Sequence, residues 1–371
     1  MVWKNIFWKE KDIMSKDLKF AIIGCGRIAI RHSEILGGNL IKGAKLVAVC
    51  DTKIEKAINI ASKFNVPYYS QIEQMMESHS IDIAVVLTPS GLHAEHVIRL
   101  NKFKCDIVVE KPMALTVEDA NNMINACEKN NNKLFIVKQN RFNKPIIKLR
   151  EAIDNDYLGK LILGTIRVRW ARHQEYYDQD NWRGTWKLDG GVIGNQASHH
   201  IDMIRWMMGE VESVYAKTKT ALVDIEAEDL AIAVLKFKSG ALGIIEATTA
   251  VRPSNIEGSI SILGEKGTVV VGGTAMNKLE TWSFEEKNDE NLLFLDDHSE
   301  NPSDVYGFGH RAYYEHVVDN IKNKVNNNTI NGNEGIKSVK LVSAMYESAE
   351  QGKEIFLDKS NGSSKLGKGH E

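Results

Sequence analysis

Lys111 and His199 are the two side chains of this 371-residue sequence whose chemistry best suits the oxidation of an alcohol. That reaction needs a hydride acceptor, a base for the hydroxyl proton, and a cation or donor that stabilises the developing alkoxide charge. With an unperturbed pKa of about 6.5, an imidazole such as His199 is a natural base near neutrality. Lys111 follows the apolar run CDIVV and can donate to the reacting oxygen. From position alone, Lys111 could equally be a solvated lysine, and a histidine such as His199 is more often part of a core.

A glycine-rich segment predicts the hydride acceptor. GCGRIA, residues 24–29, follows the apolar run LKFAII. Gly24 permits a tight turn, Gly26 lets the backbone approach a pyrophosphate, and Ala29 lets helix and strand pack closely. The next apolar run ends in Asp51, where an acidic residue binds the ribose hydroxyls of an adenosine. Glycines alone also make ordinary turns, but the whole unit predicts dinucleotide binding. Asp51 favours NAD over NADP because its charge repels a 2′-phosphate.

The elements that would position these groups begin with a doubly wound α/β domain over residues 17–138. Its expected strands are LKFAIIG, AKLVAVCD, IDIAVVLTP, CDIVVEKP and KLFIVKQ, with amphipathic stretches such as 53–64 and 116–130 between them. Near-continuous Val and Ile strands separated by helices are typical of a parallel sheet covered on both faces. Ligands of such sheets bind at the carboxyl ends of the strands. TPSGLH and EKP are therefore either part of a site or simple turns with helix caps.

Residues 139–357 predict a second α/β domain with a large, mostly antiparallel open sheet. Ser239-Gly240 joins two expected strands through a two-residue link, which is typical of a hairpin. Such hairpins indicate an antiparallel sheet with helices packed on one face. The expected strands are 161–170, 211–220, 229–238, 241–249, GSISIL and GTVVVGG, and the expected helices are 143–155, 198–208, 310–323 and 336–351.

Composition excludes several classes of function. The chain has 47 Lys+Arg against 49 Asp+Glu, whereas a general binder of nucleic acid or of a membrane surface needs a basic excess. No stretch approaches the roughly 18 apolar residues of a membrane span. The cysteines predict reduced, buried thiols and a cytoplasmic location, with neither a disulfide framework nor a zinc site. They are Cys25, Cys50, Cys105 and Cys127.

The two ends are expected to be unstructured, and no metal site is predicted. Residues 1–16 are interrupted by charge every few positions and lack the continuous apolar segment of a signal peptide, so we expect a tail. The polar, Gly- and Ser-rich segment 358–371 is expected to be disordered. His199, His200 and Asp202 have no further ligand cluster beside them that would complete a metal site.

GCGRIA, Asp51, TPSGLH and VVEKP, in this order and spacing, resemble the glucose–fructose oxidoreductase/inositol dehydrogenase (Gfo/Idh/MocA) family. GGVIGNQASHHID, residues 190–202, is similar to the family's segment GG…(D/N)xxxHxxD. The resemblance covers about residues 17–357 and implies a Rossmann domain, then an α/β domain whose open sheet face often mediates oligomers. We therefore expect a homo-oligomer, either a dimer or a tetramer. The resemblance assigns catalysis to Lys111 and His199.

One departure from the family sharpens the assignment of the base. Many family members carry Asp where this sequence has Asn195. An amide can bind a sugar hydroxyl but cannot accept its proton, so more weight falls on His199. If this segment is helical, Asp202 shares a face with His199 and could orient its ring.

A narrower resemblance concerns the substrate. KQNRFNKP, YYDQDNWRGTW, GNQASHHIDMIRWMMGEVESV and NPSDVYGFGH resemble the branch that oxidises UDP-N-acetylglucosaminuronic acid (UDP-GlcNAcA) at C3 during synthesis of bacterial surface polysaccharides such as O-antigen. With a transaminase, that branch makes UDP-2,3-diamino sugars. The resemblance therefore implies NAD as cofactor and a nucleotide sugar as substrate.

The candidate residues come from these motifs and from the resemblance. The aromatic and basic loop 176–186 can stack a base or sugar and pair with a phosphate or carboxylate, or it is an ordinary packed loop. The expected cofactor contacts are Gly24, Gly26, Arg27, Ile28, Asp51, Thr88, Pro89, Ser90, Leu92, His93, Glu110, Lys111, Gln139, Trp182 and Arg183. The expected substrate contacts are Lys111, Asn140, Arg141, Tyr177, Asn195, His199 and Tyr306.

Other functions remain open at this stage. The chain could oxidise another sugar or polyol, or it could be a glycosidase that uses NAD for transient oxidation at C3. A third reading is a non-catalytic NAD sensor or scaffold. The presence of both Lys111 and His199 argues against the sensor, which needs neither.

Overall fold

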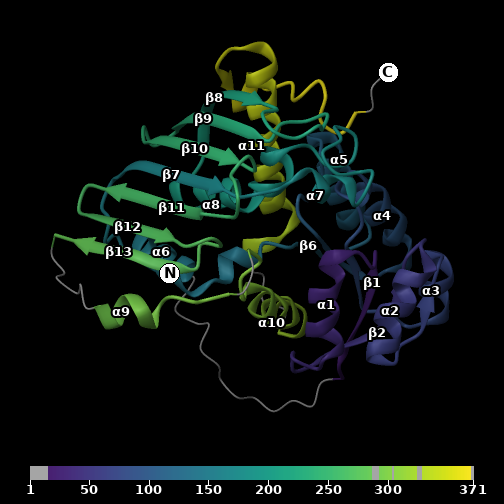
Figure 1. Ribbon diagram of the computed structural model, residues 1–371. Helices are drawn as coiled ribbons and strands as arrows, with labels where there is room; N and C mark the ends of the chain where they lie inside the picture. Colours follow the sequence, from purple (N-terminus) through teal and green to yellow (C-terminus); the bar gives the residue numbers. More distant parts are fainter. Residues whose placement is uncertain (1–15, 286–291, 303–304, 324–327, 369–371) are drawn as a thin grey trace. The chain divides into compact units, whose positions relative to one another are not determined.

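Six apolar runs form one parallel sheet in the computed structural model, which describes residues 16–285, 292–302, 305–323 and 328–368. The sheet order is β3-β2-β1-β4-β5-β6, the doubly wound order of a dinucleotide-binding domain. The predicted Rossmann domain is therefore confirmed (Figure 1). The two-residue strand β3 has no counterpart among the five predicted strands. The strands are β1 (Leu18–Ile23), β2 (Ala44–Cys50), β3 (Tyr68–Tyr69), β4 (Ile83–Val86), β5 (Asp106–Val109) and β6 (Leu134–Ile136).

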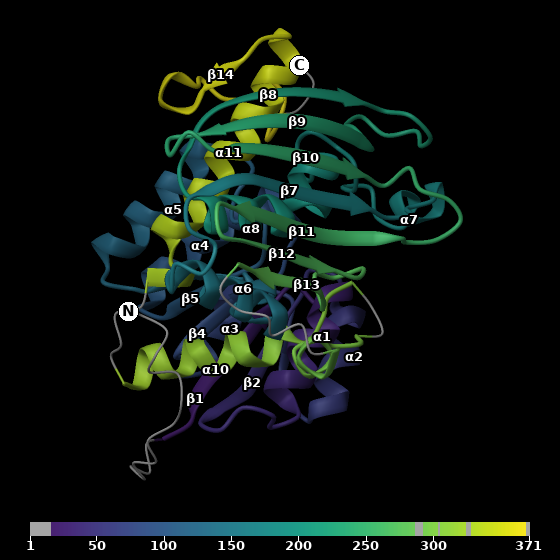
Figure 2. The same cartoon turned by 90° about the vertical axis from the view of Figure 1, so that its left-hand side faces the viewer.

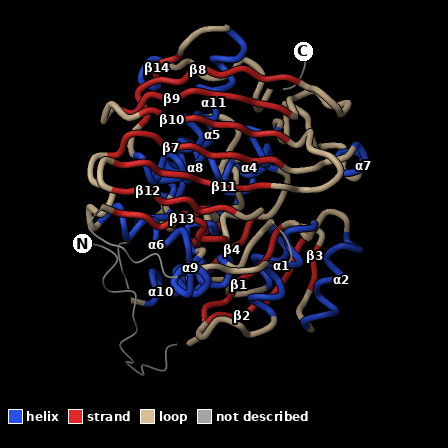
Figure 3. Tube along the Cα trace, turned by 60° about the vertical axis from the view of Figure 1, so that its left-hand side comes forward, coloured by secondary structure: helices blue, strands red, loops and turns tan. Residues whose placement is uncertain are grey.

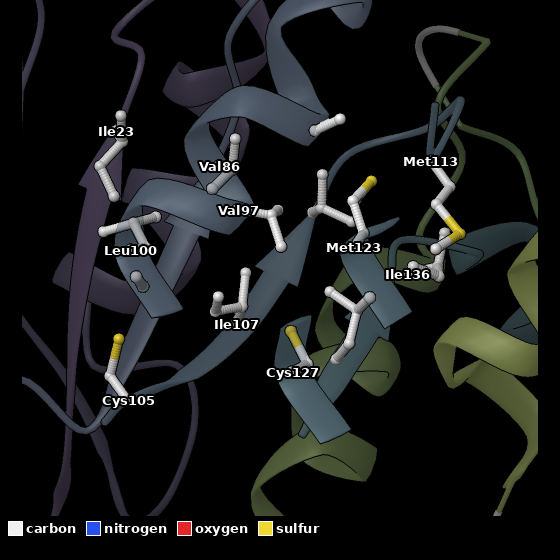
Figure 4. Packing of buried hydrophobic residues seen from close by; sticks show 14 of the residues in the cluster. Ile23, Val86, Val97, Leu100, Cys105, Ile107, Met113, Met123, Cys127 and Ile136 are labelled. Carbon is white, nitrogen blue, oxygen red and sulfur yellow. The ribbon is translucent and has the colours of Figure 1, made fainter. Parts of the chain in front are cut away.

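Helices pack on this sheet because their apolar faces match its buried strands. Thr116 caps the last of them, since its hydroxyl accepts a hydrogen bond from the Asp119 amide at 3.0 Å. Figure 4 shows Val97 of α4 and Met123 of α5 beside Ile107 of β5, in one buried hydrophobic cluster. The helices are α1 (Arg27–Gly37), α2 (Ile54–Phe64), α3 (Ile72–Ser78), α4 (His93–Leu100) and α5 (Val117–Lys129).

Residues 310–339 belong to the same compact unit as the parallel sheet. This unit, which we call the Rossmann unit, consists of Ser15–Lys138 and His310–Val339. Helix α10 (Gly309–Lys322) presents Tyr314 to the edge of the Phe20 ring at 5.8 Å, and the start of α11 (Gly332–Gln351) adds Ile336 to the hydrophobic cluster. The predicted second domain, 139–357, stays a prediction, since its residues 310–339 pack with the Rossmann unit here. Apolar residues so distant in sequence give no periodic signal of which core they join.

The second unit consists of Gln139–Gly309 and Lys340–Glu371 and is built on an eight-stranded sheet. Its order is β13-β12-β11-β7-β10-β9-β8-β14 (Figure 2). Strands β7 and β10 pair in parallel, and the other neighbouring pairs are antiparallel, as predicted. The strands are β7 (Leu161–Arg169), β8 (Val211–Lys219), β9 (Leu230–Phe237), β10 (Leu242–Thr248), β11 (Glu257–Gly264), β12 (Gly267–Gly272), β13 (Lys278–Phe284) and β14 (Ile355–Phe356). The two edge strands, β13 and β14, were not predicted.

One face of this sheet is covered by helices, which Figure 3 shows in blue behind the red strands. A Cβ on Gly164 of β7 would lie 2.8 Å from the Met208 side chain, so a glycine there lets α8 approach the sheet. Helix α6 packs against β12. The helices are α6 (Lys144–Asp154), α7 (Gln174–Asp178), α8 (Ser198–Met208) and α9 (Leu292–Asp297).

The C-terminal segment is folded as far as the structure describes it. The Ser360 hydroxyl donates to Glu347 at 2.6 Å, and the Ser363 hydroxyl donates to Glu350 at 2.5 Å. Leu366 is 2% exposed, and a Cβ on Gly190 would lie 2.9 Å from it. The prediction that 358–371 is disordered is therefore wrong up to residue 368. Composition suggested disorder, but two carboxylates of α11 satisfy these serines and one leucine anchors the segment. Residues 369–371 lie outside the described part of the chain, and so do residues 1–15 of the predicted N-terminal tail.

The four cysteines are free and buried, as the sequence predicted. Burial raises the pKa of Cys25, Cys105 and Cys127 to about 12, so these thiols stay protonated near neutral pH. In the described part of the chain, no helix combines the length and apolar character that crossing a bilayer requires.

The buried anchor of the C-terminal segment gives the first prediction. Leu366→Ala should lower the free energy of unfolding by about 2–5 kcal/mol, because it leaves a cavity beside Gly190. Leu222→Ala is the matched control, since Leu222 is 57% exposed and should cost less than about 0.5 kcal/mol. Denaturant unfolding monitored by tryptophan fluorescence measures both. Equal stability of the two variants would contradict the described packing of residues 360–368.

Candidate functional site

The turn between β1 and α1 is shaped to receive a phosphate group. Gly24 has φ +92°, and a Cβ there would lie 2.8 Å from the Leu87 carbonyl. Gly26 is the N-cap residue of α1 and makes no side-chain cap hydrogen bond. A Cβ on Gly26 would meet nothing within 4 Å. Gly26 thus brings no side chain of its own to the first amides of α1, and the space beside it is open. Helix N-terminal amides and the helix dipole favour an anion at such a place. The turn therefore fits a dinucleotide pyrophosphate.

Asp51 fixes this turn from the end of β2. Its Oδ2 accepts a hydrogen bond from the Cys25 amide at 2.7 Å, and its Oδ1 accepts one from the Lys53 amide at 2.8 Å. The carboxylate thereby joins the glycine-rich turn to the start of α2. A carboxylate has about four lone-pair sites, so two remain for ribose hydroxyls. The position of Asp51 fits the predicted role.

His93 ties the ends of β4 and β5 together. Its Nδ1 lies 2.8 Å from the Pro112 carbonyl oxygen, and its Nε2 lies 2.9 Å from the Thr88 carbonyl oxygen. The ring is 1% exposed, and burial lowers its pKa although the two carbonyls oppose the shift. His93 therefore joins the two strand ends, and its expected contact with the cofactor stays a prediction. Thr88, Pro89 and Leu92 remain half-buried around the same strand end, with Ser90 buried.

Lys111 follows β5 and is held by the residue before it. Glu110 Oε2 accepts a hydrogen bond from the Lys111 amide at 2.8 Å, while Glu110 Oε1 lies 3.0 Å from His32 Nε2. The other ring nitrogen of His32 lies 2.6 Å from the Tyr314 hydroxyl. A hydrogen-bonded chain thus runs from α10 through α1 to the residue that the sequence assigns to catalysis. Lys111 itself is half-buried.

The Glu110 side chain is buried, and its expected contact with the cofactor stays a prediction. The residue is 6% exposed, and both carboxylate oxygens have partners. Burial alone would raise the pKa of Glu110, but the hydrogen bond with His32 and the charge of Lys111 outweigh it and lower the pKa to about 2. Glu110 is therefore ionised near neutrality and positions the Lys111 backbone.

His310 completes a buried group with this pair. Among the described residues, the ligand atoms of His32, Glu110 and His310 lie within 4.8 Å of one another. Burial, with the neighbouring His32, lowers the pKa of His310 to about 3, so its ring is neutral. Because His32 and Glu110 are hydrogen-bonded to each other and the His310 ring packs against His32 at 5.2 Å, we interpret the group as a buried support of the Lys111 turn.

In the second unit, His199 lies in the first turn of α8, as predicted. Its Nε2 is 2.9 Å from the Gln139 side-chain nitrogen, and the ring is 8% exposed. The Gln139 side chain therefore fixes one edge of the His199 ring. A neutral imidazole nitrogen can take a proton from a hydroxyl. The next residue, His200, is fully buried against Trp170 and belongs to the core.

Two predicted residues beside Gln139 differ in their surroundings. Asn140 is 3% exposed, and its Oδ1 has no hydrogen-bond partner among the described residues, which suits a polar ligand. Arg141 is 1% exposed and binds both oxygens of Asp202 at 2.8 Å, with Trp206 against its guanidinium. Arg141 is therefore a buried ion-pair partner, and its expected contact with the substrate stays a prediction. That Asp202 orients His199 stays a prediction.

The aromatic and basic loop is tied to the segment before His199 by Tyr176, which the candidate list omitted. The Tyr176 hydroxyl accepts from Arg183 at 2.8 Å and from Gln196 at 3.0 Å. Arg172 donates to Gln196 Oε1 at 3.0 Å, and Arg183 also lies over the Trp182 ring at 4.6 Å. The sequence did signal Tyr176 and Gln196, through YYDQDNWRGTW and GNQASHH, but Arg172 lies in neither motif.

Tyr177 points into the core, unlike its neighbour. Its hydroxyl lies 3.0 Å from Thr249 Oγ1, it is 6% exposed, and burial raises its pKa to about 12. The expected contact of Tyr177 with substrate stays a prediction. Along the short helix α7, adjacent side chains point in different directions, and spacing alone could not say which one faces the loop.

Asn195 and Tyr306 lie in two further segments of the unit that contains His199. Asn195 lies in a π-helical turn, Val192–Gln196, and its side-chain amide donates to Asp189. Tyr306 is half-buried in the turn before α10. That turn lies against Gln139, because a Cβ on Gly309 would be 2.0 Å from the Gln139 carbonyl oxygen. Gln139, which contacts His199, therefore adjoins the Tyr306 turn.

Comparison with known proteins places this architecture. A family model for the NAD-binding Rossmann fold of the oxidoreductase family matches residues 18–138, and one for its C-terminal alpha/beta domain matches residues 150–357. The chain belongs to the Gfo/Idh/MocA family of oxidoreductases. It is thus an NAD-dependent oxidoreductase, and the predicted family and cofactor are confirmed.

The similar structures include two solved with ligands. The WlbA dehydrogenase from Bordetella pertussis, in complex with NADH and UDP-GlcNAcA, is 39% identical and has a TM-score of 0.88. The match covers 93% of this chain and 99% of that one. The WlbA dehydrogenase from Chromobacterium violaceum, with the same ligands, is 38% identical over 93% and 97% of the two chains, at a TM-score of 0.86. Myo-inositol 2-dehydrogenase from Thermotoga maritima is 27% identical over 92% of this chain and 99% of its own length.

Asp51 gives the prediction of this section. The chain should bind NAD at least about tenfold more tightly than NADP, or about 1.4 kcal/mol, because the Asp51 carboxylate repels a 2′-phosphate. Asp51→Ala should weaken NAD binding and narrow that preference. Asp82→Ala is the control, since Asp82 also accepts a backbone amide, from Lys19 at 2.8 Å, but precedes β4. Calorimetric titration with both cofactors measures the effect. Equal affinities in the unmodified protein would refute the role of Asp51.

Proposed function

We propose that the chain oxidises the C3 hydroxyl of UDP-GlcNAcA with NAD⁺. The observation that carries the proposal is the near full-length likeness, at 38% and 39% identity, to two dehydrogenases solved with NADH and UDP-GlcNAcA. A chain of this identity and coverage retains the fold on which those ligands are held. The chemical groups that the reaction needs are present in this sequence, at Lys111 and His199.

Each residue has a distinct role in the proposed reaction. His199 accepts the hydroxyl proton, and the Gln139 side chain, 2.9 Å from its Nε2, orients the ring. Lys111 donates to the substrate oxygen and stabilises its developing negative charge. Asn195 binds a sugar hydroxyl without taking its proton. Bound NAD⁺ supplies the hydride acceptor.

The polar groups around His199 support an anionic sugar substrate. Arg172 and Arg183 bring two cations to the aromatic loop, and guanidinium groups pair well with carboxylates and phosphates. The buried Asn140 Oδ1 can accept a hydrogen bond from a sugar hydroxyl. We propose that these residues bind the uronate and diphosphate groups, which inositol lacks.

Oxidation of inositol is the second candidate, and it rests on the 27% identity to myo-inositol 2-dehydrogenase over 356 residues. The guanidinium groups of Arg172 and Arg183 suit an anionic substrate better than an uncharged polyol, although Arg183 also pairs with Asp180 at 3.3 Å. A glycosidase of the same family would use the same base and cofactor but would release a free sugar without net NADH. Product analysis separates the three.

We also propose that the chain forms a homo-oligomer through the open face of its large sheet. Tyr215 of β8, Val234 of β9 and Ile244 of β10 lie side by side on that face and are exposed. Val234 is 50% exposed and Ile232 is 53% exposed. Exposed apolar patches of this kind usually mark an interface. Sedimentation velocity tests the proposal, and a monomer at micromolar concentration would contradict it.

The cellular role follows from the substrate and is part of the proposal. The keto sugar would be consumed by a transaminase, giving a diamino sugar for a surface polysaccharide. We place this activity in the cytoplasm, in keeping with four free thiols.

The catalytic assignment is tested by removing each group. His199→Ala and Lys111→Met should lower the single-turnover rate of NAD reduction by UDP-GlcNAcA by about 10²–10⁴-fold, because each acts on charge that moves only in the transition state. Affinity for NAD and for the UDP-sugar should stay within a few fold of the unmodified protein. Asn195→Ala should lose less rate, since an amide only positions the hydroxyl.

His298→Ala and Lys102→Met are the controls, because both residues lie outside the site described above. They should leave the rate unchanged. Wild-type rates in His199→Ala across the pH range would mean that His199 is not the base. Faster turnover of myo-inositol than of UDP-GlcNAcA would favour the second candidate.

A further inference from the structure

Four consecutive backbone amides, those of residues 191–194, begin the π-helical turn before α8, and two residues from elsewhere in the fold accept hydrogen bonds from all four. The amides of Gly191 and Gly194 donate to the Tyr346 hydroxyl at 3.1 and 3.0 Å. The Val192 amide donates to the Glu228 carbonyl at 2.9 Å, and the Ile193 amide donates to Glu228 Oε1 at 2.8 Å. Such amides usually find a cap in the local sequence.

The two partners are also bonded to each other. Tyr346, on α11, donates its hydroxyl proton to Glu228 Oε1 at 2.9 Å. Tyr346 is 1% exposed and Glu228, which precedes β9, is 3% exposed. The phenol oxygen therefore accepts two hydrogen bonds and donates one, which uses its full capacity. We call Glu228 and Tyr346 the amide clamp.

Glycines make room for the amide clamp. A Cβ on Gly191 would lie 2.2 Å from the Glu228 carbonyl oxygen and 2.4 Å from its carboxylate. A Cβ on Gly194 would lie 3.2 Å from the Tyr346 hydroxyl oxygen. The clamp and the GGVIG segment thus fit each other closely.

We infer that Glu228 and Tyr346 are positioning residues that set the place of Asn195 and His199. The inference rests on the proposed role of His199 as base. The segment continues without a break from the clamped amides: the Ala197 amide donates to the Val192 carbonyl at 2.8 Å, which closes the π-helical turn. His199 follows two residues later. A shift of the clamped amides therefore moves the imidazole, and misplacement by about 1 Å can cost about 10²-fold in rate.

The clamp has a titratable member. Burial raises the pKa of Glu228 to about 7, with a smaller contribution from Asp189, although the amide of Ile193 and the Tyr346 hydroxyl oppose the shift. Its folded pKa lies above the ordinary 4.5, so the stability linked to its protonation is present below pH 4.5 and is lost as pH rises through about 7. Glu228→Gln keeps the shape and the acceptor oxygen but does not ionise. Its melting temperature should gain on that of the wild type between about pH 5 and pH 8.

The decisive variant is Tyr346→Phe, which deprives Gly191 and Gly194 of their acceptor. We expect kcat for UDP-GlcNAcA to fall about 10–100-fold, while KM and NAD affinity stay within about threefold. Hydrogen exchange in a peptide spanning residues 188–200 should accelerate at least about tenfold, with the rest of the second unit unchanged. Glu228→Leu should behave likewise, and Glu228→Gln should recover most of kcat. Tyr157→Phe, a half-buried tyrosine of the same unit, is the control and should change neither quantity.

Unchanged kcat and exchange in Tyr346→Phe would overturn the inference. So would an exchange increase spread over the whole unit with kcat falling in step, since that is a loss of stability alone. A Tm difference between Glu228→Gln and wild type that is independent of pH would contradict the buried carboxylate. If the wild type leaves UDP-GlcNAcA unchanged, the proposed function fails, and local exchange at 188–200 alone then decides for or against the clamp.

Discussion

Backbone amides at the ends of strands and helices need acceptors, and in this protein carboxylates supply them wherever a functional group must be placed. Asp51 accepts from Cys25 and holds the glycine-rich turn. Glu110 accepts from Lys111 itself. Glu228 accepts from Ile193, just before the segment that carries His199. Each acceptor has a second hydrogen bond, which ties Asp51 to Lys53, Glu110 to His32 and Glu228 to Tyr346. The chemistry therefore depends on main-chain atoms held by carboxylates that are themselves fixed.

The same device has different electrostatic consequences in the two units. Glu110 is buried beside His32 and Lys111, and its pKa falls to about 2, so it is a permanent anion. Glu228 is as deeply buried, but its neighbours are a phenol and the acidic Asp189, and its pKa rises to about 7. Burial penalises both charges, and the charge of the neighbours decides which one persists. The Lys111 turn is therefore held by an ionic brace, whereas the His199 segment is held by a carboxyl group that titrates near neutrality.

Sequence patterns predicted what depends on local periodicity. The glycine-rich turn, Asp51 and the helix Ser198–Met208 are where the sequence placed them, because strand and helix periods are legible over single segments. Side-chain direction was not legible. His93, Glu110, Arg141 and Tyr177 carry suitable chemistry, but tertiary contacts turn them into the interior. The clamp residues Glu228 and Tyr346 lie more than 100 residues apart, and no motif joins them. Composition predicted disorder for the C-terminal serines, because the sequence does not show that carboxylates of α11 bind them.

The central claim is that hydride leaves C3 of UDP-GlcNAcA for NAD⁺, and isotope transfer tests it most directly. UDP-GlcNAcA carrying deuterium at C3 is incubated with the protein and NAD⁺ in a single turnover, and both products are analysed by mass spectrometry. The account predicts NADH one mass unit heavier and a keto sugar that has lost the deuterium. Unlabelled NADH, or a sugar that retains deuterium at C3, would contradict it.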